Sequence, residues 1–173
     1  MAVGLLLLAG YVYRGQDDED PGRWVPGFAA TGLVATAIGT NLSLTWPLPG
    51  PYNATFGEPS VLLGIVLLAG ALALARRWPL HSVAWYACTA GLVAVVLGVR
   101  IANLGLTAMP PLTAVGFILA GLGGLLAPVV TIYWRECRGA RLATAAVLTG
   151  SGAIWLFTAL MAYWDHLARW AAQ

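Results

Sequence analysis

Charged residues are scarce in this sequence. Only 9% of its 173 residues are Asp, Glu, Lys or Arg, whereas about a quarter are charged in a typical soluble domain. Lysine is absent, so all nine basic residues are arginine, and the net charge of +2 is too small to favour a nucleic-acid partner. Because 60% of the residues are hydrophobic and the mean hydropathy is +0.79, a soluble globule is excluded.

Cysteine and the motifs of soluble enzymes are also missing or rare. The two cysteines, Cys88 in an apolar run and Cys137 in an arginine-rich turn, are too few for a disulfide framework or a thiolate metal site. No phosphate-binding glycine loop, metalloprotease helix motif or Ser/His/Asp set occurs. The sequence therefore identifies no catalytic residue and leaves any cofactor unknown.

Long apolar runs separated by short polar breaks make up most of the chain. A membrane-spanning helix needs about 20 predominantly apolar residues. The sequence thus predicts an all-α polytopic membrane protein, a single transmembrane domain over residues 1–173 with about six helices. The predicted spans are residues 1–13, 24–44, 59–75, 80–104, 111–134 and 142–164. The first run reaches only roughly 20 Å of a core of about 30 Å, so we expect either that it does not fully cross or that the sequence begins late.

The arginines predict the orientation. Seven of the nine lie in the turns after the first, third and fifth predicted helices, and none lies in the turns after the second and fourth. Cytoplasmic loops are rich in arginine. We therefore expect those three turns to be cytoplasmic and both chain ends to be extracytoplasmic. The acidic run at residues 17–20, on the cytoplasmic side, is typical of a solvated turn.

Several predicted helices resemble one another. The second contains GLVATAIG at residues 32–39 and the fourth contains GLVAVVLG at residues 91–98, and the third and fifth also match without a gap. This similarity predicts three tandem two-helix hairpins, a parallel repeat. The 21 glycines, together with frequent alanines, indicate closely packed transmembrane helices.

The segment at residues 45–60, TWPLPGPYNATFGEPS, is the most distinctive of the chain. Four prolines in sixteen positions predict an ordered cap that is not helical throughout. With YVYRG at residues 11–15, the elements TWPLPGPYN and FGEP resemble a family of small bacterial and archaeal integral membrane proteins catalogued only as a domain of unknown function. The resemblance supports a membrane protein and implies no catalytic residue.

Polar residues at the arginine-poor helix ends are the candidates for a binding site. Ionisable groups inside apolar helices are costly and are often functional, and Arg100 lies within the fourth predicted helix. We expect an ion pair between Arg100 and either Glu58 or Asp165, the acids on that side. The remaining candidate ligand-binding residues are Asn41, Tyr52, Asn53 and Asn103.

A metal site is an alternative use of the same end. His166 could bind a metal through its imidazole, with Asp165 or Glu58 as an oxygen ligand. His81 lies at the opposite membrane face, so one chain cannot supply a bis-histidine haem site from these two residues.

Three classes of function remain open. The first is small-ligand or ion binding or transport at the extracytoplasmic helix ends. The second is a haem- or metal-binding membrane redox protein. The third is a non-catalytic accessory subunit. The expected partners are the lipid bilayer and either a homo-oligomer or a larger membrane complex, and no nucleic-acid partner is expected.

Overall fold

The chain folds into six α-helices with no strand between residues 1 and 171, the part that this computed structural model describes. The helices are α1 (Ala2–Tyr13), α2 (Val25–Thr45), α3 (Tyr52–Arg76), α4 (His81–Leu104), α5 (Pro110–Pro128) and α6 (Arg138–Ala171). Short helical turns, η1 (Gly15–Asp17) and η2 (Pro21–Trp24), join α1 to α2, and a π-helical turn, η3 (Val129–Tyr133), extends α5. The all-α prediction is therefore confirmed.

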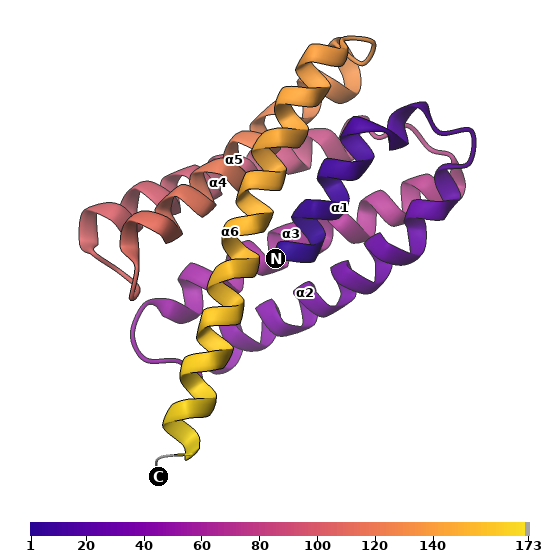
Figure 1. Cartoon of the computed structure of the whole chain (residues 1–173). Helices are drawn as coiled ribbons and strands as arrows, with labels where there is room; N and C mark the ends of the chain where they lie inside the picture. Colours follow the sequence, from indigo (N-terminus) through magenta and orange to yellow (C-terminus); the bar gives the residue numbers. More distant parts are fainter. Residues whose placement is uncertain (172–173) are drawn as a thin grey trace.

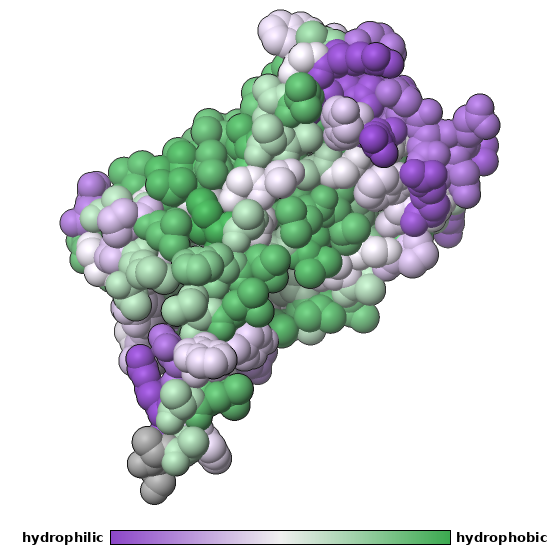
Figure 2. All heavy atoms as spheres, viewed as in Figure 1, coloured by the Kyte–Doolittle hydropathy of each residue, from purple (hydrophilic) through white to green (hydrophobic). Residues whose placement is uncertain are grey.

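Five of the helices are long and apolar enough to cross a membrane, and α1 is a shorter apolar helix. Figure 2 shows an apolar band along the molecule, with hydrophilic residues gathered beyond its ends. The connections after α1, α3 and α5 all lie at one end of the bundle, at the upper right of Figure 1. This is the arginine-rich end. The sequence and the fold together identify a membrane protein.

The helices pack most extensively as α2 with α3, α4 with α5, and α1 with α6. Glycines allow the first two pairs to approach closely. A Cβ on Gly32 would lie 2.9 Å from the carbonyl oxygen of Gly64, and one on Gly91 would lie 2.5 Å from that of Gly121. The sequence predicts hairpins of the first helix with the second, the third with the fourth and the fifth with the sixth. These are not the pairs with the most extensive contacts, and the internal repeat is not confirmed.

The proline-rich segment is more helical than the sequence predicts. Helix α3 begins at Tyr52, and Pro59 lies inside it, so that the cap is limited to residues 46–51. A proline within a helix removes one main-chain donor. The helix nevertheless continues through Pro59, which is buried in the bundle. Glu58 is consequently part of α3, whereas the sequence predicts a span that begins at residue 59.

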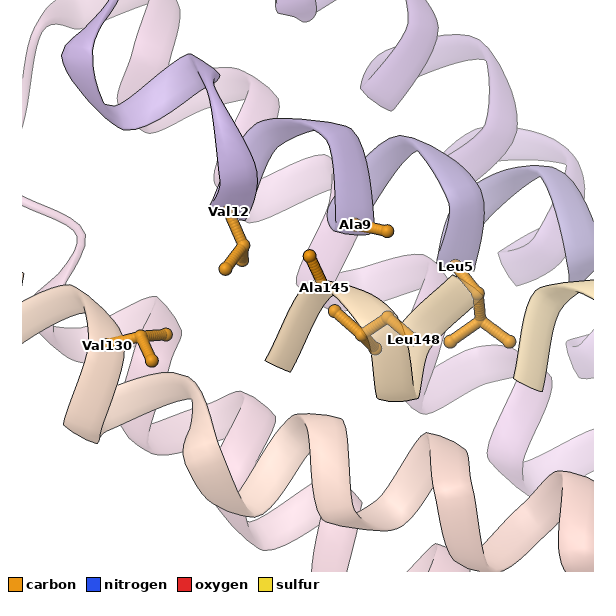
Figure 3. Packing of buried hydrophobic residues seen from close by; sticks show 6 residues of the cluster. All are labelled: Leu5, Ala9, Val12, Val130, Ala145 and Leu148. Carbon is orange, nitrogen blue, oxygen red and sulfur yellow. The ribbon is translucent and has the colours of Figure 1, made fainter. Parts of the chain in front are cut away.

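Two apolar clusters connect the ends of the chain to the bundle. In the first, Leu5, Ala9 and Val12 of α1 face Val130 of η3 and Ala145 and Leu148 of α6 (Figure 3). The second centres on Phe117 of α5, whose ring meets that of Trp155 of α6 edge-on at 4.9 Å between centroids. Beside it, the Ser151 hydroxyl donates to the Gly116 carbonyl at 2.7 Å.

Helix α6 is much longer than the span predicted at residues 142–164. Its 34 residues correspond to about 51 Å, against a hydrocarbon core of about 30 Å. Its last turns extend away from the other helices in Figure 1, and residues 159–171 are all exposed. Asp165 and His166 therefore lie on a projecting helix and not at its end.

Candidate functional site

The polar residues predicted at the arginine-poor end do not bond to one another. Within the described part of the chain, no hydrogen bond or ion pair joins any two members of that set. Most of these residues have exposed side chains, namely Asn41, Glu58, Arg100, Asn103 and Asp165. Tyr52 is half-buried and stacks against the ring of Phe56 at 6.2 Å between centroids.

The expected ion pair of Arg100 is not formed. Over residues 1–171, the ion pairs are Arg23 with Asp18 and Arg141 with Asp17. Arg100 lies in the last turns of α4 and is exposed, so its long side chain can reach the interface without a carboxylate. The prediction failed because it required a carboxylate partner for an arginine within an apolar helix, whereas Arg100 is exposed near the end of α4.

Asn53 is the one member of the predicted set that is fully buried, at 0% exposure. Its side-chain oxygen accepts a hydrogen bond from the Leu48 amide at 2.9 Å, and its nitrogen donates to the Leu48 carbonyl at 2.5 Å and the Gly50 carbonyl at 3.4 Å. These bonds close the turn between α2 and α3. Asn53 therefore has a structural role here.

His166 has no second and third ligand around it. Among the residues described, no group of three or more His, Cys, Asp or Glu side chains lies close enough to hold a metal ion. His166 itself is exposed on the projecting part of α6. A metal or haem site at His166 would need ligands from another molecule.

The arginine-rich end contains a buried residue that the sequence did not single out. Arg141, in the first turn of α6, is only 4% exposed. Its guanidinium donates to the carbonyls of Val12 (2.9 Å) and Tyr13 (2.6 Å) and to the Asp17 carboxylate (2.6 Å). The last carbonyls of a helix lack intrahelical partners, so Arg141 satisfies the end of α1 and links the first helix to the last.

The acidic run is more ordered than a solvated turn. Asp17 pairs with Arg141, and Asp18 binds Arg23 at 2.7 Å and accepts a hydrogen bond from the indole of Trp24. Asp20 accepts from the Gly22 amide and caps η2. Asp17 therefore joins the connection between α1 and α2 to α6, and Asp18 and Asp20 order the connection itself.

A cavity of about 300 Å³ opens at this end; we call it the polar cavity. Gln16, which the sequence did not indicate either, lines it. This side chain is 7% exposed, and neither its amide nitrogen nor its amide oxygen has a hydrogen-bond partner. The other lining residues are Tyr11, Gly15, Asp18, Pro21, Leu74, Arg77, Trp78, Pro79, Leu80, His81, Thr131 and Arg135.

A second cavity lies between α1, α3, α4, α5 and α6; we call it the central cavity. Its volume is about 110 Å³, and its walls are almost wholly apolar. Small residues on α4 and α5, such as Ala87, Ala90, Gly123 and Ala127, leave this space, and Leu5 and Leu148 close it from α1 and α6. Walls of this kind favour an apolar group over water.

The two cavities are neighbours along the bundle axis. Tyr11 lines the polar cavity, and the next residue of α1, Val12, lines the central cavity. On the fifth helix, Ala127 lines the central cavity and Thr131, about one turn later, lines the polar one. The arrangement offers an apolar chamber in the bundle with a polar chamber at its arginine-rich end.

Comparison with known proteins identifies the family and no activity. Residues 1–169 match the model of a family described as "Protein of unknown function (DUF981)", and the chain belongs to that family. The resemblance seen in the sequence is therefore confirmed. No curated protein and no solved structure matches the chain.

Proposed function

We propose that this member of the DUF981 family is a membrane protein that binds the apolar part of a small lipid-like molecule inside its helix bundle. The central cavity is the observation that carries this proposal. A ligand site is typically concave and mostly apolar, with a few polar groups at its edge. The central cavity, with the polar cavity next to it, has that composition.

The sequence also predicts small-ligand binding, but at the arginine-poor helix ends. We place the binding site in the central cavity instead. The predicted outer residues are mostly exposed, whereas the two cavities lie in the bundle and at the arginine-rich end. The middle of the bundle offers no charged pathway, because the walls of the central cavity are apolar. Binding of an uncharged chain is therefore favoured over conduction of ions.

A substitution that fills the central cavity tests the proposal. Ala90→Leu places a larger side chain into the cavity from α4, whereas Ala102→Leu makes the same change at an exposed position of the same helix. The protein, in nanodiscs made from a total lipid extract, is examined by native mass spectrometry. We expect a bound small molecule in the wild type and in Ala102→Leu and its loss in Ala90→Leu. Equal occupancy in the two variants, or none in the wild type, would reject the proposal.

The orientation in the membrane is part of the proposal. We infer that the arginine-rich end is cytoplasmic and that the opposite end, toward which the C-terminal part of α6 extends, is extracytoplasmic, as the arginine distribution indicates. Cys137, exposed between α5 and α6, and Ala108→Cys, exposed between α4 and α5, lie at opposite ends of the bundle. An impermeant thiol reagent added to intact cells should label Ala108→Cys and not Cys137. The reverse pattern would contradict the orientation.

The projecting part of α6 favours a second candidate, an accessory subunit of a membrane complex. Residues 159–171 are all exposed, although Trp164, Leu167 and Trp170 are large and apolar. A photo-crosslinking amino acid at position 167 in native membranes tests this function. A discrete protein adduct at 167, absent when the probe is at exposed Leu33 of α2, would support it. Adducts to lipid alone would reject it.

A further inference from the structure

We propose that the polar cavity binds a phosphate group. This site is distinct from the central cavity, so the inference stands whether or not an apolar chain occupies the bundle. Three features of the cavity support it: its charge, an unpartnered buried amide, and the start of a helix.

The charge of the cavity favours an anion. Arg77 and Arg135 line it, and Asp18 is the acid in its wall. The Asp18 carboxylate is already held by the guanidinium of Arg23 at 2.7 Å, so its charge is largely offset. The cavity therefore has an excess of positive charge from two arginines, whose planar guanidinium groups suit phosphate oxygens.

The buried amide of Gln16 needs a partner. Both of its polar atoms are buried without a hydrogen bond, and buried polar groups in native proteins are normally satisfied. The main chain of Gln16 is held in place, since the Arg135 guanidinium donates to its carbonyl at 2.8 Å. The amide nitrogen can donate to a phosphate oxygen, and the amide oxygen can accept from a phosphate hydroxyl or from water.

The N-terminus of α4 meets the same cavity. The wall includes Pro79, Leu80 and His81, and α4 begins at His81. The N-cap residue, Leu80, provides no side-chain hydrogen bond to the first amides of this helix. The start of a helix carries free N–H groups and a partial positive charge, and phosphate groups bind there readily.

The position of the cavity fits two sources of phosphate. Its volume of about 300 Å³ exceeds that of a lone phosphate and leaves room for part of a lipid headgroup. The arginine-rich end, by our inferred orientation, faces the leaflet in which anionic lipids are concentrated. The ligand is therefore a phosphate group, carried either by a lipid or by a soluble molecule.

The test measures binding to purified full-length protein in a non-ionic detergent. The probes are dioctanoyl phosphatidic acid, inorganic phosphate and, as a carboxylate control, octanoate. Arg77 is exposed, so Arg77→Gln should fold normally, and Gln16→Leu removes the unpartnered amide. We expect each to weaken binding of phosphatidic acid about tenfold, and Arg77→Lys to recover part of the loss. Arg138→Gln is the matched control, since Arg138 lies at the same end but does not line the cavity.

Each outcome decides the proposal or the source of the phosphate. Binding of phosphatidic acid alone identifies a lipid headgroup, and equal binding of inorganic phosphate identifies a soluble ligand. Equal binding of octanoate, or an equal loss in Arg138→Gln and Arg77→Gln, would show a general attraction of anions and would overturn the proposal. Failure of the wild type to bind either phosphate probe would overturn it as well. Ala90→Leu changes only the central cavity, so it should bind phosphatidic acid as the wild type does. Phosphate binding in this variant, together with loss of the apolar ligand, would show that the two sites are separate.

Discussion

Replacement of Arg141 by leucine should destabilise the fold substantially. The guanidinium of Arg141 makes three hydrogen bonds, two of them to the last carbonyls of α1 and one to Asp17. Leucine would leave the carbonyls of Val12 and Tyr13 without these donors, at a position that is 4% exposed in the wild type. The connection between the first and the last helix would lose its polar contacts.

The magnitude follows from those bonds. A hydrogen bond from a charged donor contributes about 1.5–3 kcal/mol, so the two carbonyl bonds contribute roughly 3–6 kcal/mol. The Asp17 side chain is 59% exposed, so solvent screening reduces its pairing to about 0.5 kcal/mol. Leucine no longer pays the desolvation of a buried cation, which offsets part of the loss. We expect a net loss of about 3 kcal/mol, a decrease of roughly 6–12 °C in Tm for a chain of this length.

Thermal unfolding in detergent, followed by circular dichroism, measures this effect. Arg138→Leu is the matched control, because Arg138 lies one turn earlier, is exposed and makes no side-chain hydrogen bond within residues 1–171; its Tm should change little. Asp17→Asn should cost about 0.5 kcal/mol. If Arg141→Leu behaved like Arg138→Leu, the capping role would be refuted. A loss in Asp17→Asn as large as in Arg141→Leu would show that the ion pair, and not the carbonyl bonds, holds the two helices together.

Two further substitutions test the packing and the turn. Gly91→Ala should destabilise the α4–α5 pair by about 1–3 kcal/mol, because its Cβ would lie 2.5 Å from the Gly121 carbonyl oxygen, whereas Gly150→Ala, with 3.5 Å to its nearest neighbour, should be neutral or slightly stabilising in thermal unfolding. Equal effects would contradict the close approach of α4 and α5. Asn53→Ala should cost about 2 kcal/mol through its lost hydrogen bonds, and the exposed Asn103→Ala should cost almost nothing. A larger effect at Asn103 would refute the structural role of Asn53.

The closely packed glycines show what the similarity between predicted helices could indicate about packing and what it could not. The matching segments of the second and fourth predicted helices do contain glycines that pack closely, at Gly32 and Gly91. The similarity did not reveal that α2 packs mainly against α3 and α4 mainly against α5. This pairing leaves α1 to pack against α6. Similar surfaces indicate close contact with some partner, but the partner depends on the whole bundle.

Most residues of the candidate site could not be predicted from the sequence. Arg138 and Arg141 lie in the same arginine-rich turn, and nothing local distinguishes them. The structure buries Arg141 and leaves Arg138 exposed. Gln16 likewise follows an ordinary helix end, and its burial depends on packing against residues more than a hundred positions away.

The sequence by itself determined that this is a helical membrane protein with its arginine-rich turns at one end. That result is local, because the thickness of the bilayer sets the length of an apolar helix and the arginines lie between such helices. The tertiary structure decided which helices pair, which arginine is buried and where the cavities lie. Those features join distant segments, as when Arg141 binds the carbonyl of Val12, 129 positions earlier. Such contacts depend on how six helix surfaces fit together, and no single segment contains that information.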